Sequence, residues 1–207
     1  MNITIIGAGK MARGIATRAM VGGNRVLILA RDIADAEQLA SELGRGTLTG
    51  MLGDDLLDDI VVLAVPYQAV GEILSLYRDQ LVGKVLVDIT NPIDFDTFQP
   101  MMLPAGSAAQ EIAAAAPGAR VVKAFNTTFA GTLIDGHVAG RPVDVLIAGN
   151  DQSAKQVVSQ LVTDGEMRAV DAGPITLAHQ LESMGYLHIA LQQTLGTHYA
   201  STMKVLA

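Results

Sequence analysis

Cysteine and tryptophan are absent from the 207-residue sequence, and only 4% of its residues are aromatic. Without cysteine the chain can form no disulfide, no thiolate nucleophile and no cysteine-based metal site. This absence favours a reducing, cytoplasmic setting. Histidine is also scarce, at four residues. No cluster of His, Asp and Glu has the spacing of metal ligands, so we expect no metal.

Basic residues are few as well. The 14 Lys and Arg against 21 Asp and Glu give a net charge of −7, with no basic block, which argues against nucleic-acid binding. Apolar runs such as IVVLAVP are far too short to cross a bilayer, so we expect no membrane partner. Residues 1–6 enter a strand-like run directly, without the basic stretch that begins a signal peptide.

Glycine and aliphatic residues are abundant instead. Continuous runs of Val, Ile and Leu alternate with helix-like stretches, which is typical of a parallel sheet covered by helices on both faces. Right-handed crossovers would then give a doubly wound, Rossmann-type α/β fold. We expect strands at 2–6, 25–30, 46–50, 60–65, 84–89, 120–125, 143–148 and 167–170, and helices at 10–21, 33–43, 68–80, 107–116, 151–164 and from about 174.

The chain is long enough for one large core, or for one domain with a small addition. We expect an NAD(P)-binding Rossmann domain over residues 1–172. A C-terminal helical segment over residues 173–207 would complete the pocket for an acceptor. Three prolines in residues 91–106 predict a loop over the carboxyl edge of the sheet.

The first strand is followed by the motif G-x-G-x-x-A. Gly7 permits a tight turn, Gly9 lets a pyrophosphate approach the backbone, and Ala12 lets helix and strand pack closely. The backbone N–H groups of Lys10 and Met11 would then face the phosphates at a helix N-terminus. The alternative is a tight strand–helix turn without a ligand. The position of the motif at the first strand–helix junction favours dinucleotide binding.

The end of the second strand indicates which dinucleotide binds. Sites for NAD usually place Asp or Glu there, to hold the ribose 2′-hydroxyl. Here Ala30 leaves room for a 2′-phosphate, and Arg31 supplies a planar cation to bind it. This favours NADP(H). If the strand continued for two more residues, Asp32 would take the ribose position and the cofactor would be NAD.

Three further strands end in proline or polar residues. Because the carboxyl ends of parallel strands share one edge, we expect these residues to line a cleft there. Turn chemistry alone is the simpler explanation for each of them taken singly. The cofactor side would comprise Ala64, Val65, Pro66, Asn91 and Pro92, and the substrate side Asn126 and Thr127.

The last helix carries three histidines and an apolar seam. His188 lies on the seam, so we expect a packed or interface histidine rather than a catalytic one. His179 and Glu182 share one helix face, and form either a solvated pair or part of the pocket lining. The seam is long, which suggests a homodimer packed through this helix. The alternative is a helix folded back over its own domain.

Five segments together carry a resemblance to a known family: GAGKMARGIA, VVLAVP, VDITNP, VVKAFNT and VDAGPITLAHQLES. With them the chain resembles the F420-dependent NADP oxidoreductase family over nearly its whole length. The same pattern occurs in the cytoplasmic reductase domain of the STEAP metalloreductases. The first segment alone is also similar to pyrroline-5-carboxylate reductase, but the DAGP turn and the following helix favour the first family.

The resemblance implies a Rossmann domain that binds NADPH and a small C-terminal segment that shapes the pocket of a hydride acceptor. Arg31 matches the arginine that binds the 2′-phosphate. Ala30 departs from the hydroxyl residue often found at that position, which removes one phosphate contact. Asn126 matches a His or Asn position beside the acceptor ring. The implied acceptor is the deazaflavin F420.

The expected function is therefore an NADPH-dependent oxidoreductase that transfers hydride to a small flavin or deazaflavin acceptor. Such a transfer requires the protein mainly to hold two rings in contact and to exclude water, so we expect no catalytic side chain. Two alternatives remain. The first is a reductase of small imines or carbonyls, which would need a proton donor. The second is a non-catalytic NADP(H)-binding regulatory module.

Overall fold

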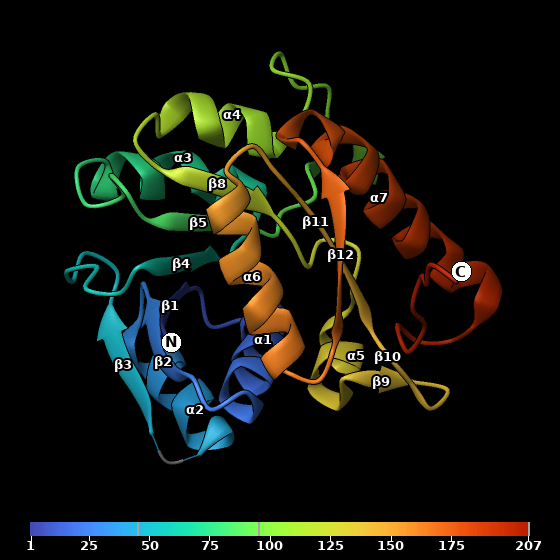
Figure 1. Cartoon of the computed structure of the whole chain (residues 1–207), viewed down its shortest axis with the longest axis horizontal. Coiled ribbons are helices and arrows are strands. Elements are labelled where there is room, and N and C mark those ends of the chain that lie inside the picture. Colours follow the sequence, from blue (N-terminus) through green and yellow to red (C-terminus); the bar gives the residue numbers. More distant parts are fainter. Residues whose placement is uncertain (45, 95, 207) are drawn as a thin grey trace.

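The computed structural model describes residues 1–44, 46–94 and 96–206. Arg45 and Phe95, inside the predicted first domain, and Ala207, at the end of the predicted C-terminal segment, lie outside the described residues. Figure 1 shows one central sheet with helices on both faces. Within the described residues, no helix combines the length and the apolar character needed to span a membrane.

The central sheet has eight strands in the order β12-β11-β8-β5-β4-β1-β2-β3. Six of them, β1 to β5 and β8, run parallel to one another. The predicted Rossmann-type α/β fold is confirmed. The strands are β1 (Asn2–Ile6), β2 (Arg25–Ala30), β3 (Thr47–Met51), β4 (Ile60–Leu63), β5 (Val85–Asp88), β8 (Arg120–Lys123), β11 (Asp144–Gly149) and β12 (Arg168–Gly173).

The strands are continuously apolar because both faces of the sheet are buried. In β4, Ile60 and Val62 point into one core, while Val61 and Leu63 point into the other. The first core lies under α1 (Lys10–Val21), α2 (Ile33–Leu43), α5 (Ala130–Asp135) and α6 (Gln152–Asp164). The second lies under α3 (Tyr67–Tyr77) and α4 (Ala108–Ala115). No position in such a strand faces water, so no polar alternation appears.

The expectation of an entirely parallel sheet is wrong at one junction. β11 pairs with β8 in the antiparallel sense, through only two residue pairs, Ala148 with Lys123 and Gly149 with Val122. The chain between these strands folds α5 against α1, where a Cβ on Gly14 would come within 2.8 Å of Leu133 Cβ. After this segment the chain re-enters the sheet in the opposite direction, as β11. β12 then runs parallel to β11.

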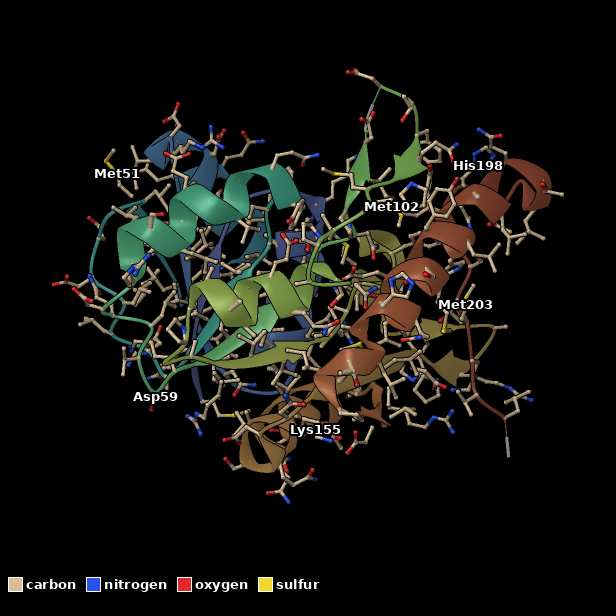
Figure 2. The ribbon with its side chains drawn as sticks, turned by 90° about the horizontal axis from the view of Figure 1, so that it is seen from above. Met51, Asp59, Met102, Lys155, His198 and Met203 are labelled. Carbon is tan, nitrogen blue, oxygen red and sulfur yellow. The ribbon has the colours of Figure 1, made fainter. Side chains whose placement is uncertain are left out.

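Several short elements were not expected. α5 is one, and the others are the hairpins β6 (Ile93–Asp94) with β7 (Gln99–Pro100), and β9 (His137–Val138) with β10 (Arg141–Pro142). The first hairpin lies within the predicted loop 91–106. It projects from the body of the molecule in Figure 2, followed by Met102, which is 95% exposed. All the predicted strands and helices exist, with boundaries shifted by a few residues.

The last helix begins later than predicted. Pro174 has an extended backbone and precedes a single 3₁₀ turn, η1 (Ile175–Leu177), so the helix α7 starts at Ala178 and ends at Leu195. It lies beside β11 and β12, at the end of the sheet away from β3 (Figure 1). Leu181 packs there against Leu146 and Ala148. The helix is therefore folded over its own chain along one face.

Candidate functional site

The turn between β1 and α1 is built so that backbone, not side chain, lines it. Gly7 has φ +116°, and a Cβ there would lie 2.3 Å from the carbonyl oxygen of Ala64. A side chain at this position is excluded twice, by backbone conformation and by space. A Cβ on Gly9 would meet nothing within 4 Å. Gly9 thus faces open space at the point where a pyrophosphate would approach.

The N-terminus of α1 opens toward that space. Gly9 is the N-cap and offers no side-chain cap, and the first helical bond runs from Arg13 N–H to Gly9 O. The N–H groups of Lys10 and Met11 therefore have no intrahelical partner. Ala12 is fully buried against the sheet. Together with the helix dipole, this arrangement is suited to an anion.

A cleft of about 330 Å³ runs along this turn. It extends from Gly7 and Gly9 past Ala30 and Arg31, and its other wall includes Val65 on the far side of the turn. The cleft lies between β1 and β4, where the strand order of the sheet reverses. Such a switch point is where open α/β sheets bind ligands.

The end of β2 distinguishes the two readings of its sequence. The strand stops at Ala30 and does not reach Asp32. Asp32 is instead the N-cap of α2, and its carboxylate accepts a hydrogen bond of 2.9 Å from Ala34 N–H. Arg31 is exposed and lines the cleft. The geometry favours Arg31 over Asp32 as the residue that meets the adenosine ribose.

The next strand ends meet at the same edge. Ala64 follows β4 and packs its backbone against Gly7, and Pro66 is the N-cap of α3. Pro66 lines a second open region of about 680 Å³ that also includes Arg31. Of the predicted cofactor-side residues, Val65 lines the first cleft and Pro66 the second, and Arg31 lines both. Asn91 and Pro92 line neither of these two clefts.

Two asparagines join the ends of β5 and β8. Asn91 donates from Nδ2 to Asn126 O at 2.8 Å, and Asn126 donates from Nδ2 to Asn91 Oδ1 at 2.9 Å. Asn126 also donates to Leu181 O on α7, at 2.8 Å. Gly185 completes the contact, because a Cβ there would lie 2.7 Å from the Asn91 amide. The pair therefore docks α7 onto the strand ends.

A small cavity of about 40 Å³ lies in front of this pair. Asn91 and Pro92 line it, as do His179 and Glu182 from α7. Asn126 and Thr127, predicted on the substrate side, are not among its lining residues, and each is only 4% exposed. Asn126 is hydrogen-bonded to Asn91, which lines the cavity, whereas the carbonyl oxygen of Thr127 lies 3.1 Å from His188 Nδ1.

Beside the cavity lies a cluster of buried charges that sequence reasoning missed. The ammonium of Lys123, which has no exposed surface, lies 2.8 Å from Asp88 Oδ2 and 2.7 Å from Glu182 Oε1, and it also donates to Thr90 O. Glu182 accepts a further bond of 3.1 Å from Ala108 N–H at the start of α4. Burial raises the pKa of the Glu182 carboxyl, while Lys123 lowers it.

A sequence signal for this cluster existed. Asp88 ends an otherwise apolar strand, Lys123 follows two buried valines at the end of the next strand, and the two charges are register partners. Charges at the ends of two adjacent buried strands must be paired. Glu182 could not be assigned to them, because the position of α7 over the sheet is set by tertiary packing.

His188 is a packed histidine, as predicted. It is 2% exposed, its Nδ1 lies 3.1 Å from Thr127 O, and its Nε2 lies 2.9 Å from Ser201 Oγ. Burial lowers its pKa. His179 is exposed and makes no ion pair with Glu182, although both line the same cavity. Glu182 pairs with Lys123 instead, and the role of this cavity as an acceptor pocket stays a prediction.

One further titratable pair joins α3 to α4. Tyr67, in the first turn of α3, donates a hydrogen bond to Glu111 on α4. Burial and this carboxylate raise the pKa of the Tyr67 phenol. Within the described residues, no group of three or more His, Asp or Glu side chains could hold a metal ion.

Comparison with known proteins gives a consistent result. The family model described as NADP oxidoreductase, coenzyme F420-dependent, matches residues 2–92. The F420-dependent NADP reductase of Methanothermobacter thermautotrophicus is 35% identical, over 92% of this chain and 89% of its own. Metalloreductase STEAP3 of Rattus norvegicus is 30% identical over 88% of this chain, but over only 36% of its own length.

Solved structures agree on the fold. A structure from Arthrobacter sp. FB24, provisionally assigned as an F420-dependent NADP reductase, is 29% identical with a TM-score of 0.87, and 99% of each chain is covered. An imine reductase of Myxococcus stipitatus, solved with NADP⁺, is 20% identical with a TM-score of 0.69, over 96% of this chain and 64% of its own. The second similarity concerns the fold alone.

Proposed function

Because the chain belongs to the F420-dependent NADP oxidoreductase family, we propose that it passes hydride between NADP(H) and a flavin or deazaflavin acceptor of the F420 type. That it is an NADP-dependent oxidoreductase follows from the family. The acceptor is the proposed part. The observation that carries it is the cavity at Asn91 and His179, which shares Met101 as a lining residue with the open region beside Pro66 and Arg31.

We propose that the groove holds NADP(H) through residues of the β1, β2, β4 and β5 ends. The open space at Gly9 and the uncapped N-terminus of α1 fit a pyrophosphate, and exposed Arg31 fits a 2′-phosphate. The nicotinamide half would lie toward Pro66 and Asn91. The full set is Gly7, Gly9, Lys10, Met11, Ala12, Ala30, Arg31, Ala64, Val65, Pro66, Asn91 and Pro92.

The residues around the acceptor act by position in this proposal. The cofactor, when bound, supplies the hydride at its nicotinamide C4. Asn126 fixes Asn91 and the backbone of α7, so that the cavity wall keeps its distance from the strand ends. His179 lines the acceptor side. Each turnover toward the reduced acceptor consumes NADPH and one proton, which solvent can supply at the exposed side of the cavity.

The division of the chain follows the same logic. We propose that residues 1–172 bind the cofactor and that residues 173–207 complete the acceptor pocket, since α7 contributes His179 and Glu182 to the cavity. The hydrogen bond from Asn126 to Leu181 O and the ion pair of Lys123 with Glu182 join the two parts. Both parts would therefore be needed to form the pocket.

A homodimer in the cytoplasm, where NADPH is available, completes the proposal. Its support is the outward face of α7, where Leu187 and Leu195 are each 53% exposed. Light scattering on the purified protein should give twice the chain mass of 21.7 kDa. A Leu187→Lys variant should shift the mass toward the monomer, and cell fractionation should recover the protein with cytoplasmic markers.

The acceptor is tested by a screen with NADPH as donor. F420, FMN, FAD, ferric chelates and cyclic imines are offered in turn, and NADPH oxidation is followed by its absorbance. We expect turnover with F420 or a flavin. A tenfold or larger preference for a cyclic imine would replace the proposal with imine reduction, and binding without any turnover would replace it with a regulatory role.

The mechanism is tested in single turnovers with the acceptor so identified. Direct hydride transfer predicts a primary isotope effect with deuterium at the transferred position. Replacing His179 or His188 by Gln should leave the chemical step within about tenfold, whereas loss of a general acid typically costs about 10²–10⁴-fold. A larger loss, with intact folding and NADPH affinity, would assign that histidine as a proton donor.

A further inference from the structure

A second cleft adjoins the cofactor groove on the outer side of the phosphate turn. It has a volume of about 350 Å³ and lies between α1 and α2. Three of its lining residues, Ala8, Gly9 and Asp35, also line the groove that contains Arg31. The two clefts therefore share one wall, formed by the phosphate turn and the first turn of α2.

The cations of the second cleft are not equivalent. Arg13 forms an ion pair with Glu42 at 3.0 Å, which ties α1 to α2. Lys10, at the first position of α1, is exposed, and no hydrogen bond or ion pair holds its ammonium within the described part of the chain. Of the two cations, Lys10 is the one available to a ligand.

The other side of the shared wall is poor in phosphate ligands. Ala30 contributes only a methyl group, and it is 6% exposed. Asp35 places a carboxylate on the wall of both clefts, where it disfavours an anion. Arg31 alone would have to hold a dianionic phosphate at an exposed site, where a single cation is screened by water and salt.

We propose that the side chain of Lys10 is the second cation of the 2′-phosphate site and sets the preference for NADPH over NADH, with Asp35 opposing it. The backbone N–H of Lys10 would face the pyrophosphate common to both cofactors, whereas its side chain lines the second cleft, next to Gly9, which lines both clefts. The 2′-phosphate then sits between Arg31 and Lys10. This inference rests on the proposed placement of the adenosine ribose at Arg31.

Equilibrium titration of NADPH and NADH, by calorimetry or by nicotinamide fluorescence, tests it without any acceptor. Lys10→Met should weaken NADPH about 10-fold and NADH less than about 2-fold. Asp35→Asn should tighten NADPH about 2- to 5-fold and leave NADH unchanged. Arg13→Met is the matched control. It also removes a cation from this cleft, but that cation is already paired with Glu42. It should leave the preference unchanged.

The outcomes separate this inference from the site on which it rests. Arg31→Ala should reduce the NADPH preference about 10- to 100-fold. If Arg31→Ala does so and Lys10→Met does not, the Lys10 assignment is wrong and the ribose placement stands. If neither variant changes the preference, both are wrong. Equal losses of affinity for NADPH and NADH in Lys10→Met would also overturn the proposal. So would a loss of NADPH preference in Arg13→Met as large as that in Lys10→Met.

Discussion

Replacement of Lys123 by Met should lower the free energy of unfolding by about 3–5 kcal/mol at pH 7. The reason is the environment of its ammonium, which has no exposed surface and contacts carboxylates at 2.7 and 2.8 Å. Methionine fills similar space, but it leaves Asp88 and Glu182 as uncompensated buried charges. The loss is a large part of the total stability of a domain, which is about 5–15 kcal/mol.

The loss should depend on pH in a defined direction. Burial already raises the pKa of Glu182 above its ordinary value of 4.5, and removal of Lys123 raises it further. An acid whose pKa is raised by folding binds its proton more tightly in the folded state. Its folded state is therefore favoured below about pH 4.5 and loses stability as the pH rises toward the folded pKa. The deficit of Lys123→Met should grow from pH 4.5 to pH 7.

Urea unfolding followed by circular dichroism at several pH values measures this deficit. Adding Glu182→Gln to Lys123→Met should recover part of the stability, because one stranded charge is removed. Lys84→Met is the control, since Lys84 is only partly buried and bonds one carbonyl oxygen, Asp58 O. It should cost less than about 1 kcal/mol. If Lys123→Met instead loses less than about 1 kcal/mol of unfolding free energy, with no dependence on pH, the argument is refuted.

Three other changes have expected outcomes. Gly9→Val should weaken NADPH and NADH alike by about 100-fold or more, because its side chain would fill the open space at the phosphate turn; unchanged binding in a titration would disprove that placement. Gly185→Ala should lower the free energy of urea unfolding by about 1–3 kcal/mol, since its Cβ would meet the Asn91 amide at 2.7 Å, and an unchanged stability would contradict this contact. For Asp144, burial raises the pKa, but bonds from Arg168 and Lys204 outweigh it and lower the pKa to about 2. Asp144→Asn should therefore cost about 1–2 kcal/mol at pH 7 and progressively less as the pH falls from 3.8 toward 2, and equal losses at both ends of a pH series of unfolding curves would contradict this.

The sequence was sufficient for the parts of the molecule that local rules determine. Apolar runs and G-x-G-x-x-A specify the order of elements and the phosphate turn, because Gly7 meets a requirement of backbone conformation that can be recognised without a structure. The direction of β11 could not be foreseen, since it depends on how α5 packs against Gly14.

The same limit applied to the candidate site. Asn126 and Thr127 were recognised as strand-end residues, yet the sequence could not show that both would be buried and that Asn91, bonded to Asn126, would line the cavity instead. The contact of Glu182 with Lys123 joins residues 59 positions apart on different elements (182 − 123). Partners that are distant in the chain are set by packing, and periodicity contains no information about them.

The junction between β8 and β11, with its two residue pairs, has a consequence for how such enzymes diversify. The residues before it line the whole cleft at the turn between β1 and α1, where we propose that the dinucleotide binds, and the matched family model likewise ends at residue 92. The residues after it carry α7 and its wall of the cavity. The two sides also meet where α5 packs against α1 at Gly14, so an exchange has to keep that contact. We expect that exchanging the part of the chain beyond residue 124 for that of a relative would change the hydride acceptor and preserve NADP(H) as the hydride donor.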